Sequence, residues 1–235
     1  MMLCSKQKRQ EVKRGKGQVS LKTIPCPLHF ASRWQLLIDS LSISSSLANP
    51  AWLDLCGRYN ENGRFYHNLT HIEQMLDVVD SLSALVRDET AVQLAVWFHD
   101  IIYDPRANDN EAQSAAYAAN VLHQWQYPQI EKVEWLILAT KGDGTPMYDP
   151  DFAVLLDADL AVLGASPAKY DRYANAIRQE YAFVPDEAYR NGRSAVLRQF
   201  LDRPRIYQTE KMFAERETAV SPNLIRELNS LKNNP

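Results

Sequence analysis

The 235-residue sequence is poor in glycine and in cysteine. Eight glycines are few for an all-β fold, which turns tightly between many short strands, so the composition favours helices. The three cysteines, Cys4, Cys26 and Cys56, form neither an even disulfide set nor a metal-binding spacing. Cysteine usage therefore indicates a reducing compartment and predicts a cytoplasmic protein.

The sequence also lacks a long apolar run. The longest candidate, residues 91–103, is interrupted by His99 and Asp100, whereas a membrane span needs about 20 apolar residues. No apolar run follows the basic residues near the N-terminus, as a signal peptide would require. We therefore expect a soluble protein that is not exported and has no membrane partner.

An overall excess of positive charge is absent as well. The formal net charge is −3, so the protein as a whole has no electrostatic reason to bind a nucleic acid polymer. Within residues 1–22, however, seven basic residues stand against one acidic residue, with little that could pack. We expect residues 1–27 to form a basic, disordered tail and residues 28–235 to form one helical domain. Nothing in the sequence sets its oligomeric state.

Helical spacing of apolar residues continues from residue 30 almost to the C-terminus, and no segment alternates strictly. The predicted helices cover residues 31–43, 50–59, 70–85, 89–103, 111–125, 130–140, 151–163, 167–181, 186–201 and 209–231. Asn49 and Pro50 suit the start of the second helix, and Thr70 with Glu73 matches the capping box of the third. The pattern predicts an all-α, single-domain helical bundle.

Histidine is scarce and concentrated. Three of the five histidines fall in two clusters, Tyr-His-Asn-Leu-Thr-His at 66–71 and Phe-His-Asp at 98–100. The second cluster lies within an apolar predicted helix, where a buried carboxylate must be paired, hydrogen-bonded or bound to a metal. A divalent cation beside His99 and Asp100 would provide this compensation. Imidazole nitrogens with carboxylate oxygens suit Mn, Fe, Co, Ni, Zn or Mg.

The order of His71, the His99-Asp100 pair and a distal aspartate resembles the HD superfamily of metal-dependent phosphohydrolases. Four segments are similar to one subfamily of uncharacterised HD phosphohydrolases: Tyr-His-Asn-Leu-Thr-His at 66–71, Trp-Phe-His-Asp-Ile-Ile-Tyr at 97–103, Asn-Glu-Ala-Gln-Ser-Ala at 110–115 and Leu-Asp-Ala-Asp-Leu-Ala-Val-Leu-Gly at 156–164. The resemblance spans residues 30–210. It implies a helical bundle of the HD/PDEase-like type and a metal-dependent phosphoric ester hydrolase.

The resemblance also implies roles for individual residues. His71, His99, Asp100 and one distal aspartate would bind the metal. The first cluster is similar to the Tyr-His-Asn-x-x-His of cyclic nucleotide phosphodiesterases, where the second histidine binds metal and the first donates a proton to the leaving oxygen. This similarity implies that His71 is a ligand and that His67 is the catalytic acid.

The distal motif contains two aspartates, Asp157 and Asp159. Its Ala-Asp-Leu segment is similar to the segment around the ligand in related families, which favours Asp159 and leaves Asp157 as the alternative. On a helix the two side chains point about 200° apart, so at most one of them faces the metal.

Two-metal relatives carry further histidines after the His-Asp pair. Here only His123 lies downstream of Asp100, and Lys141 and Gly142 stand in the loop where many relatives have a histidine. We therefore expect one divalent metal ion.

The implied reaction is hydrolysis of a nucleotide or another small phosphoester by metal-activated water, with Asp100 also accepting the proton of that water. Candidate substrate-binding residues are Arg64, Lys141 and Arg178 for the phosphate, and Glu111 beside the site. The alternatives are solvated or salt-bridged roles for the three cations and a helix-capping role for Glu111.

Two other functions are compatible with the motifs. Some helical HD proteins hold two irons and act as oxygenases, but that chemistry depends on additional histidines. A catalytically silent module, in which metal or ligand binding serves regulation, is the second alternative.

Overall fold

The computed structural model describes residues 28–142 and 149–233, and in these residues it contains ten α-helices, two short 3-10 helices and no strand. The helices are α1 (Leu28–Ser40), α2 (Ser45–Tyr59), α3 (Leu69–Ser81), η1 (Ser83–Leu85), α4 (Glu89–Phe98), α5 (Asn110–Gln124), α6 (Ile130–Ala139), α7 (Pro150–Asp159), η2 (Leu160–Val162), α8 (Pro167–Glu180), α9 (Asp186–Leu201) and α10 (Glu210–Asn233). The predicted all-α helical bundle is confirmed. The predicted tail, residues 1–27, and positions 143–148 of the predicted loop lie outside the described residues.

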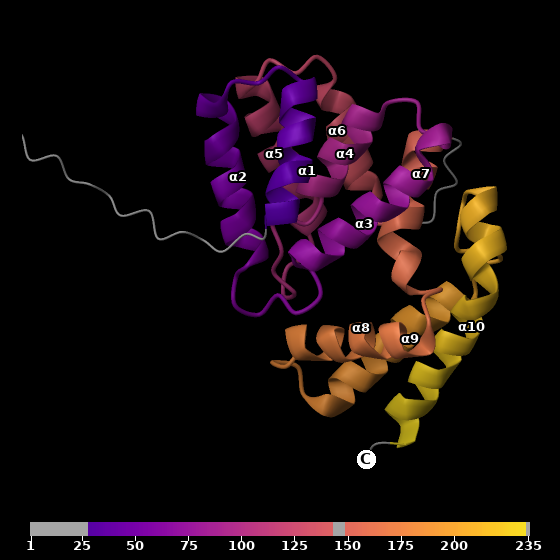
Figure 1. The fold of residues 1–235 in the computed structure, drawn as a ribbon. Helices are drawn as coiled ribbons and strands as arrows, with labels where there is room; N and C mark the ends of the chain where they lie inside the picture. The colour runs from indigo at the N-terminus through magenta and orange to yellow at the C-terminus, as the bar shows by residue number, and fades with distance from the viewer. Residues whose placement is uncertain (1–27, 143–148, 234–235) are drawn as a thin grey trace, which may run out of the picture.

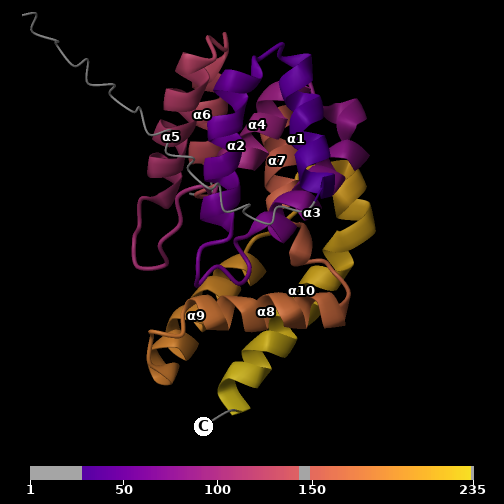
Figure 2. The ribbon, with the colours of Figure 1, turned by 60° about the vertical axis from the view of Figure 1, so that its left-hand side comes forward.

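The helices form two groups (Figure 1). Helices α1 to α7 make the larger bundle, and α4, which is apolar nearly all round, packs against α3, α5, α6 and α7 inside it. Helices α8 and α9 lie across one end of this bundle, and α10 begins beside the bundle and runs past α8 and α9 to the C-terminus (Figures 1 and 2). The metal-site motifs come from α3, α4 and α7, so they lie where the two groups meet.

A cluster of tryptophans fixes α4 within the bundle. The Trp34 ring of α1 lies 5.5 Å from the Trp97 ring and 5.8 Å from the rings of Trp52 and Trp125, measured between centroids. Trp97 is fully buried. Offset and edge-on aromatic pairs add about 0.5–1.5 kcal/mol each beyond their buried area, so the cluster holds the C-terminal end of α4 in place.

Helix α4 ends at Phe98, although its pattern predicted a helix to residue 103. The carbonyl of Trp97 accepts from the Tyr59 hydroxyl at 3.0 Å, and Arg64 donates to the carbonyls of Asp100 at 2.6 Å and Ile101 at 2.9 Å. These side chains replace the bonds that a further helical turn would make. His99 is therefore the C-cap of α4, and Asp100 lies in the turn after it.

Two helix starts also differ from the prediction. Helix α2 begins at Ser45, so Pro50 lies inside it. In α3 the N-cap is Asn68, whose side-chain oxygen accepts from the Thr70 N–H at 2.9 Å, so Thr70 is already helical. His71 consequently lies in the first turn of α3, as the sequence predicted.

In the ranges that the structure describes, none of the helices combines the length and the apolar character needed to cross a membrane.

Candidate metal centre

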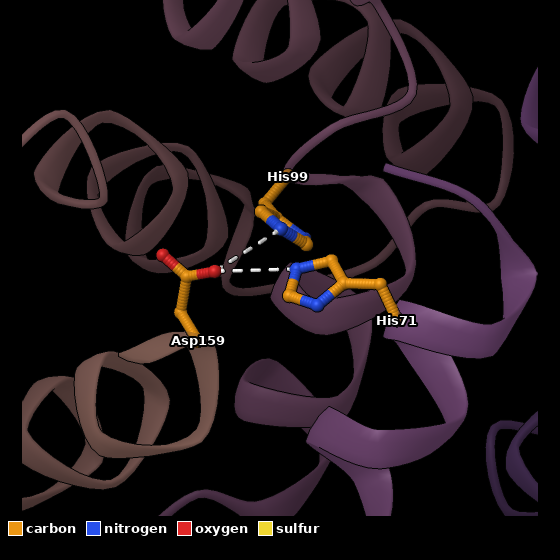
Figure 3. A group of neighbouring side chains, drawn as sticks. All are labelled: His71, His99 and Asp159. Carbon is orange, nitrogen blue, oxygen red and sulfur yellow. Dashed lines mark ion pairs between the residues drawn. The ribbon is translucent and has the colours of Figure 1, made fainter. Parts of the chain in front are cut away.

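Three elements bring His71, His99 and Asp159 together (Figure 3). His71 comes from the first turn of α3, His99 from the C-cap of α4, and Asp159 from the last residue of α7. Each of the three offers a ligand atom, and these atoms all lie within 4.8 Å of one another. This group could hold a metal ion.

The distances place two carboxylates against two imidazoles. The Nε2 atom of His71 lies 3.2 Å from Asp159 Oδ1, and the Nε2 atom of His99 lies 3.0 Å from Asp100 Oδ2. The crossed distances are 4.0 Å from His71 Nε2 to Asp100 Oδ2 and 3.9 Å from His99 Nε2 to Asp159 Oδ1. Both histidine side chains are only 2% exposed. Asp100 therefore borders the group, although it is not one of the three mutually close residues.

The two Nε2 atoms are buried and lack a hydrogen bond of acceptable geometry, despite the nearby carboxylates. In His99 the other ring nitrogen, Nδ1, donates to the carbonyl of Val96 at 3.0 Å, so Nε2 is the nitrogen that faces the carboxylates and that would bind a metal on losing its proton. A buried polar atom without a partner costs about 1–3 kcal/mol. A cation between the rings and the carboxylates would remove that cost, so the donor set fits a metal.

The charges in the group are strongly coupled. Burial opposes a charge on His99, but the Asp100 carboxylate outweighs it and raises the pKa of His99 to about 9. Burial lowers the pKa of His71. For Asp100, burial is outweighed by His99, His67 and His71, and the pKa falls well below its usual range. Asp100 is therefore ionised at neutral pH, as a metal ligand or proton acceptor must be.

Asp157 faces away from the two histidines. Its carboxylate accepts from the Gln208 N–H at 2.6 Å, from the Thr209 N–H at 2.8 Å and from the Thr209 hydroxyl at 2.7 Å. These bonds fix the segment that leads into α10. Of the two aspartates that the sequence offered, only Asp159 lies with the histidines, so the alternative of Asp157 as the ligand is not supported.

Glu180, at the end of α8, is a residue of this site that the sequence analysis did not identify. It is 4% exposed, and its Oε1 accepts from the backbone N–H groups of Phe65, Tyr66 and His67 at 2.7–2.9 Å. Its Oε2 accepts from His67 Nδ1 at 2.7 Å and from the Tyr103 hydroxyl at 2.9 Å. One carboxylate therefore shapes the loop before α3 and orients the His67 ring.

A sequence signal for Glu180 did exist. Glu180 follows Tyr173 and Ile177 at helical spacing, so it lies on the stripe that α8 turns toward the protein. A carboxylate on such a stripe needs buried partners. The sequence alone could not show that those partners lie more than 110 residues earlier in the chain.

The His67 ring is fixed in place and its pKa is raised. Burial lowers its pKa, but Asp100 and Glu180 outweigh burial, and the net shift is upward. With Nδ1 bound to Glu180, Nε2 is the ring nitrogen that this hydrogen bond leaves free. The Tyr103 ring stacks on the imidazole, with 4.2 Å between centroids.

The three predicted phosphate-binding cations have other partners. Arg64 donates to the carbonyls of Asp100 and Ile101, and Lys141 donates to the carbonyl of Asn108 at 2.9 Å. The Arg178 guanidinium reaches the Tyr181 carbonyl at 2.7 Å and Asp186 at 2.6 Å. These cations satisfy loop carbonyls and a surface carboxylate, so the structure lends their predicted phosphate contacts no support.

Glu111 lies in the first turn of α5 and is half-buried. A carboxylate in this position is favourable because of the exposed N–H groups and the helix dipole. Its placement therefore agrees with the helix N-terminal alternative, while the predicted role beside the substrate stays a prediction.

Two cations that were not predicted line a cleft of about 220 Å³ next to His71. Lys169 and Arg172 both belong to α8, and neither forms an ion pair with another described residue. The sequence gives no signal for them, because exposed basic residues are common on helices. Their position brings uncompensated positive charge to the edge of the metal centre.

Comparisons with known proteins assign no family to this geometry: no family model, no curated protein and no solved structure matches the chain. The HD resemblance therefore stays a prediction, and the functional argument depends on the side chains described above.

Proposed function

We propose that the chain is a metal-dependent phosphoric ester hydrolase of the HD type, which binds one divalent ion through His71, His99, Asp100 and Asp159. One observation carries the proposal: the buried Nε2 atoms of His71 and His99 face two carboxylates without a hydrogen bond. Bound there, Mn, Fe, Co, Ni, Zn or Mg supplies a Lewis acid that lowers the pKa of water and neutralises charge on phosphoryl oxygens.

The protein's own groups perform the proton transfers. In the hydrolysis, the oxygen of water forms a bond to phosphorus, and the bond from phosphorus to the leaving oxygen breaks. The leaving oxygen gains a proton and becomes an alcohol. Asp100 accepts the proton that the attacking water loses and then releases it to solvent. His67 donates a proton from Nε2 to the leaving oxygen and is reprotonated from solvent, while Glu180 holds the ring through Nδ1.

The side chains around the two histidines would orient a phosphoester substrate. Lys169 and Arg172 line the cleft beside His71 and attract the phosphoryl group, because their charges are not used by ion pairs with other described residues. The His67 ring lies 6.0 Å from the His71 ring, measured between centroids, lines a different cleft and is oriented by Glu180 of α8. The phosphoryl group therefore lies toward His71 and the leaving group toward His67.

The hydrolase is favoured over the two alternatives. The HD oxygenase needs two irons, whereas the described residues contain one group of three side chains that could hold a metal. A silent module needs no proton donor, whereas His67 is oriented and its pKa is raised.

The test is turnover of a panel of nucleotides and simple phosphoesters after chelation and after re-addition of each divalent metal. We expect phosphate release to return with one or more metals, and to be lost in His99→Ala and Asp159→Asn. His123→Gln is the matched control, because His123 is exposed on α5 and outside the site. A stoichiometrically bound metal without turnover of any ester would refute the hydrolase.

A further inference from the structure

A second, larger cleft opens beside His67, between α8 and α9. Its volume is about 490 Å³, which lies in the range of small-molecule sites. Apart from His67 and Arg193, its walls are almost entirely apolar or aromatic, and they include Tyr173, Ile177, Tyr181, Tyr189, Val196 and Phe200. The cleft thus differs from the one beside His71, which carries Lys169 and Arg172.

The one strong cation in this cleft is already paired. The Nε atom of Arg193 donates to Glu227 Oε1 at 2.7 Å, and Nη2 donates to Oε2 at 3.1 Å. The guanidinium also lies over the Tyr173 ring, 5.2 Å from its centroid. Arg193 therefore fixes the wall of the cleft and has little charge left for a phosphate.

The apolar wall remains open to solvent. Val196 is 40% exposed although it lines a concave surface, and Tyr189 and Phe200 line the same cleft. Burying such surface against a ligand is worth about 25 cal/mol per Å² of apolar area removed from water. The chemistry of the wall suits a flat, apolar ring much better than a charged group.

We propose that this cleft binds the leaving group of the substrate, and that the leaving group is an alcohol carrying an aromatic ring. This inference rests on the proposed hydrolase function. His67, the acid in that function, belongs to the wall of the cleft, so an alcohol seated there presents its oxygen to the proton donor. The phosphoryl group and the ring then occupy two clefts of opposite character, which share Tyr173 as a wall.

Gly192 of α9 gives a direct way to fill the cleft. It lines the cleft, and a Cβ atom built on it would meet nothing within 4 Å. Gly192→Phe therefore adds a ring where the substrate ring would lie and also removes a glycine from the interior of a helix, which favours folding. Asn191→Phe adds the same ring at the neighbouring exposed position, outside the cleft, and is the matched control.

The experiment compares 2-phenylethyl phosphate with ethyl phosphate on the metal-loaded protein. Both leaving groups are simple alcohols of similar acidity, so a difference in kcat/KM reports the ring. We expect a preference for the phenylethyl ester of about 10-fold to 100-fold in the wild type and in Asn191→Phe, and its loss in Gly192→Phe.

Binding of 2-phenylethanol, followed by titration calorimetry without any ester, tests the cleft independently of turnover. Binding to the wild type and to Asn191→Phe, but not to Gly192→Phe, supports the proposal. Equal kcat/KM for the two esters together with no binding of the alcohol overturns it while the hydrolase function stands. If no ester is hydrolysed, the proposed hydrolase function is refuted. The binding experiment then still decides whether the cleft binds an aromatic ring.

Discussion

Asp157 and Asp159 are two residues apart, yet their surroundings differ completely, because Asp159 faces two histidines and Asp157 accepts three hydrogen bonds before α10. We expect Asp159→Asn to weaken divalent-metal affinity by more than the roughly 10–100-fold loss typical of partners that only support a ligand. Asp157→Asn should instead keep the metal affinity and lower the free energy of unfolding by about 1–3 kcal/mol.

Calorimetric titration with Zn or Mn and urea unfolding of the two variants separate these effects. Loss of metal affinity in Asp157→Asn, with Asp159→Asn unaffected, would reverse the assignment of the two aspartates.

The role of His67 as an acid predicts a dependence on the leaving group. An alkoxide must be protonated as it departs, whereas 4-nitrophenolate departs without a proton. His67→Gln should therefore lower kcat/KM for ethyl phosphate by about 10²–10⁴-fold and change that for 4-nitrophenyl phosphate far less. An equal loss on both esters would show that His67 serves folding or metal binding and not proton donation.

Glu180→Gln supplies the matching pH experiment. It keeps an oxygen for the loop N–H groups and removes the charge that helps to raise the pKa of His67. Because the acid is active only while protonated, the rate falls as the pH rises through the pKa of His67. We expect the alkaline limb for ethyl phosphate to move to lower pH in this variant.

At the residue scale, the sequence pointed to candidate site residues where a motif is local. His71, His99 and the Asp-Ala-Asp segment could be located because their spacing resembles a known pattern. Glu180, Lys169 and Arg172 could not, because all three lie on α8 and reach the site only through its packing across the end of the bundle. Arg64 lies beside the first histidine motif, which suggested a phosphate contact. Its actual partners, the carbonyls of Asp100 and Ile101, are brought to it only by the tertiary structure.

At the scale of elements, apolar periodicity predicted which segments are helical, while the ends depended on distant partners. Helix α4 stops at Phe98 because Tyr59 and Arg64, from an earlier part of the chain, satisfy the carbonyls that follow. The capping box placed the start of α3 at Thr70, whereas the structure uses Asn68, which is also a good cap. These few residues matter functionally, because they set where His99 and His71 point.

Asp151, in the first turn of α7, links three elements and makes a pH-dependent contribution. Its buried carboxylate accepts from the N–H groups of Arg87 at 2.6 Å and Asp88 at 3.2 Å, and from Lys132 Nζ at 2.7 Å. Burial acts to raise the pKa of Asp151, but these donors outweigh it and hold that pKa below its usual value. A depressed carboxyl pKa stabilises the fold above the unfolded pKa of about 3.9, and the contribution disappears as the pH falls through the folded pKa.

We therefore expect Asp151→Asn to lower the free energy of unfolding at pH 7 by about 1–3 kcal/mol. The difference from the wild type should shrink at pH 3. Urea unfolding at pH 7, 4 and 3 measures it. A difference that is the same at all three pH values would indicate a packing effect rather than loss of the carboxylate charge.

At the scale of the whole molecule, the metal centre joins the parts of the fold. Its ligand groups come from α3, α4 and α7, and Glu180 connects the loop before α3 to α8. The sequence predicted a bundle, but it could not show that α8 and α9 would lie across its end and add two clefts to the site (Figure 2). Most residues that line the larger cleft therefore come from the part of the chain after the last predicted ligand.

An ion held by three helices should stabilise the whole fold. At a free metal concentration of 100 times Kd, binding to the folded state alone adds about 2.7 kcal/mol, which corresponds to a rise in Tm of roughly 5–11 °C for a chain of this size. We expect this rise between chelated and reloaded wild-type protein in thermal unfolding, and little change in His99→Ala.

Protons compete for the imidazoles, and Asp100 raises the pKa of His99 in the ion-free protein to about 9, so the rise in Tm should grow from pH 6 to pH 9. The same rise in His99→Ala would place the ion elsewhere. No rise in the wild type at any pH would leave the unbonded Nε2 atoms unexplained and remove the basis of the hydrolase proposal.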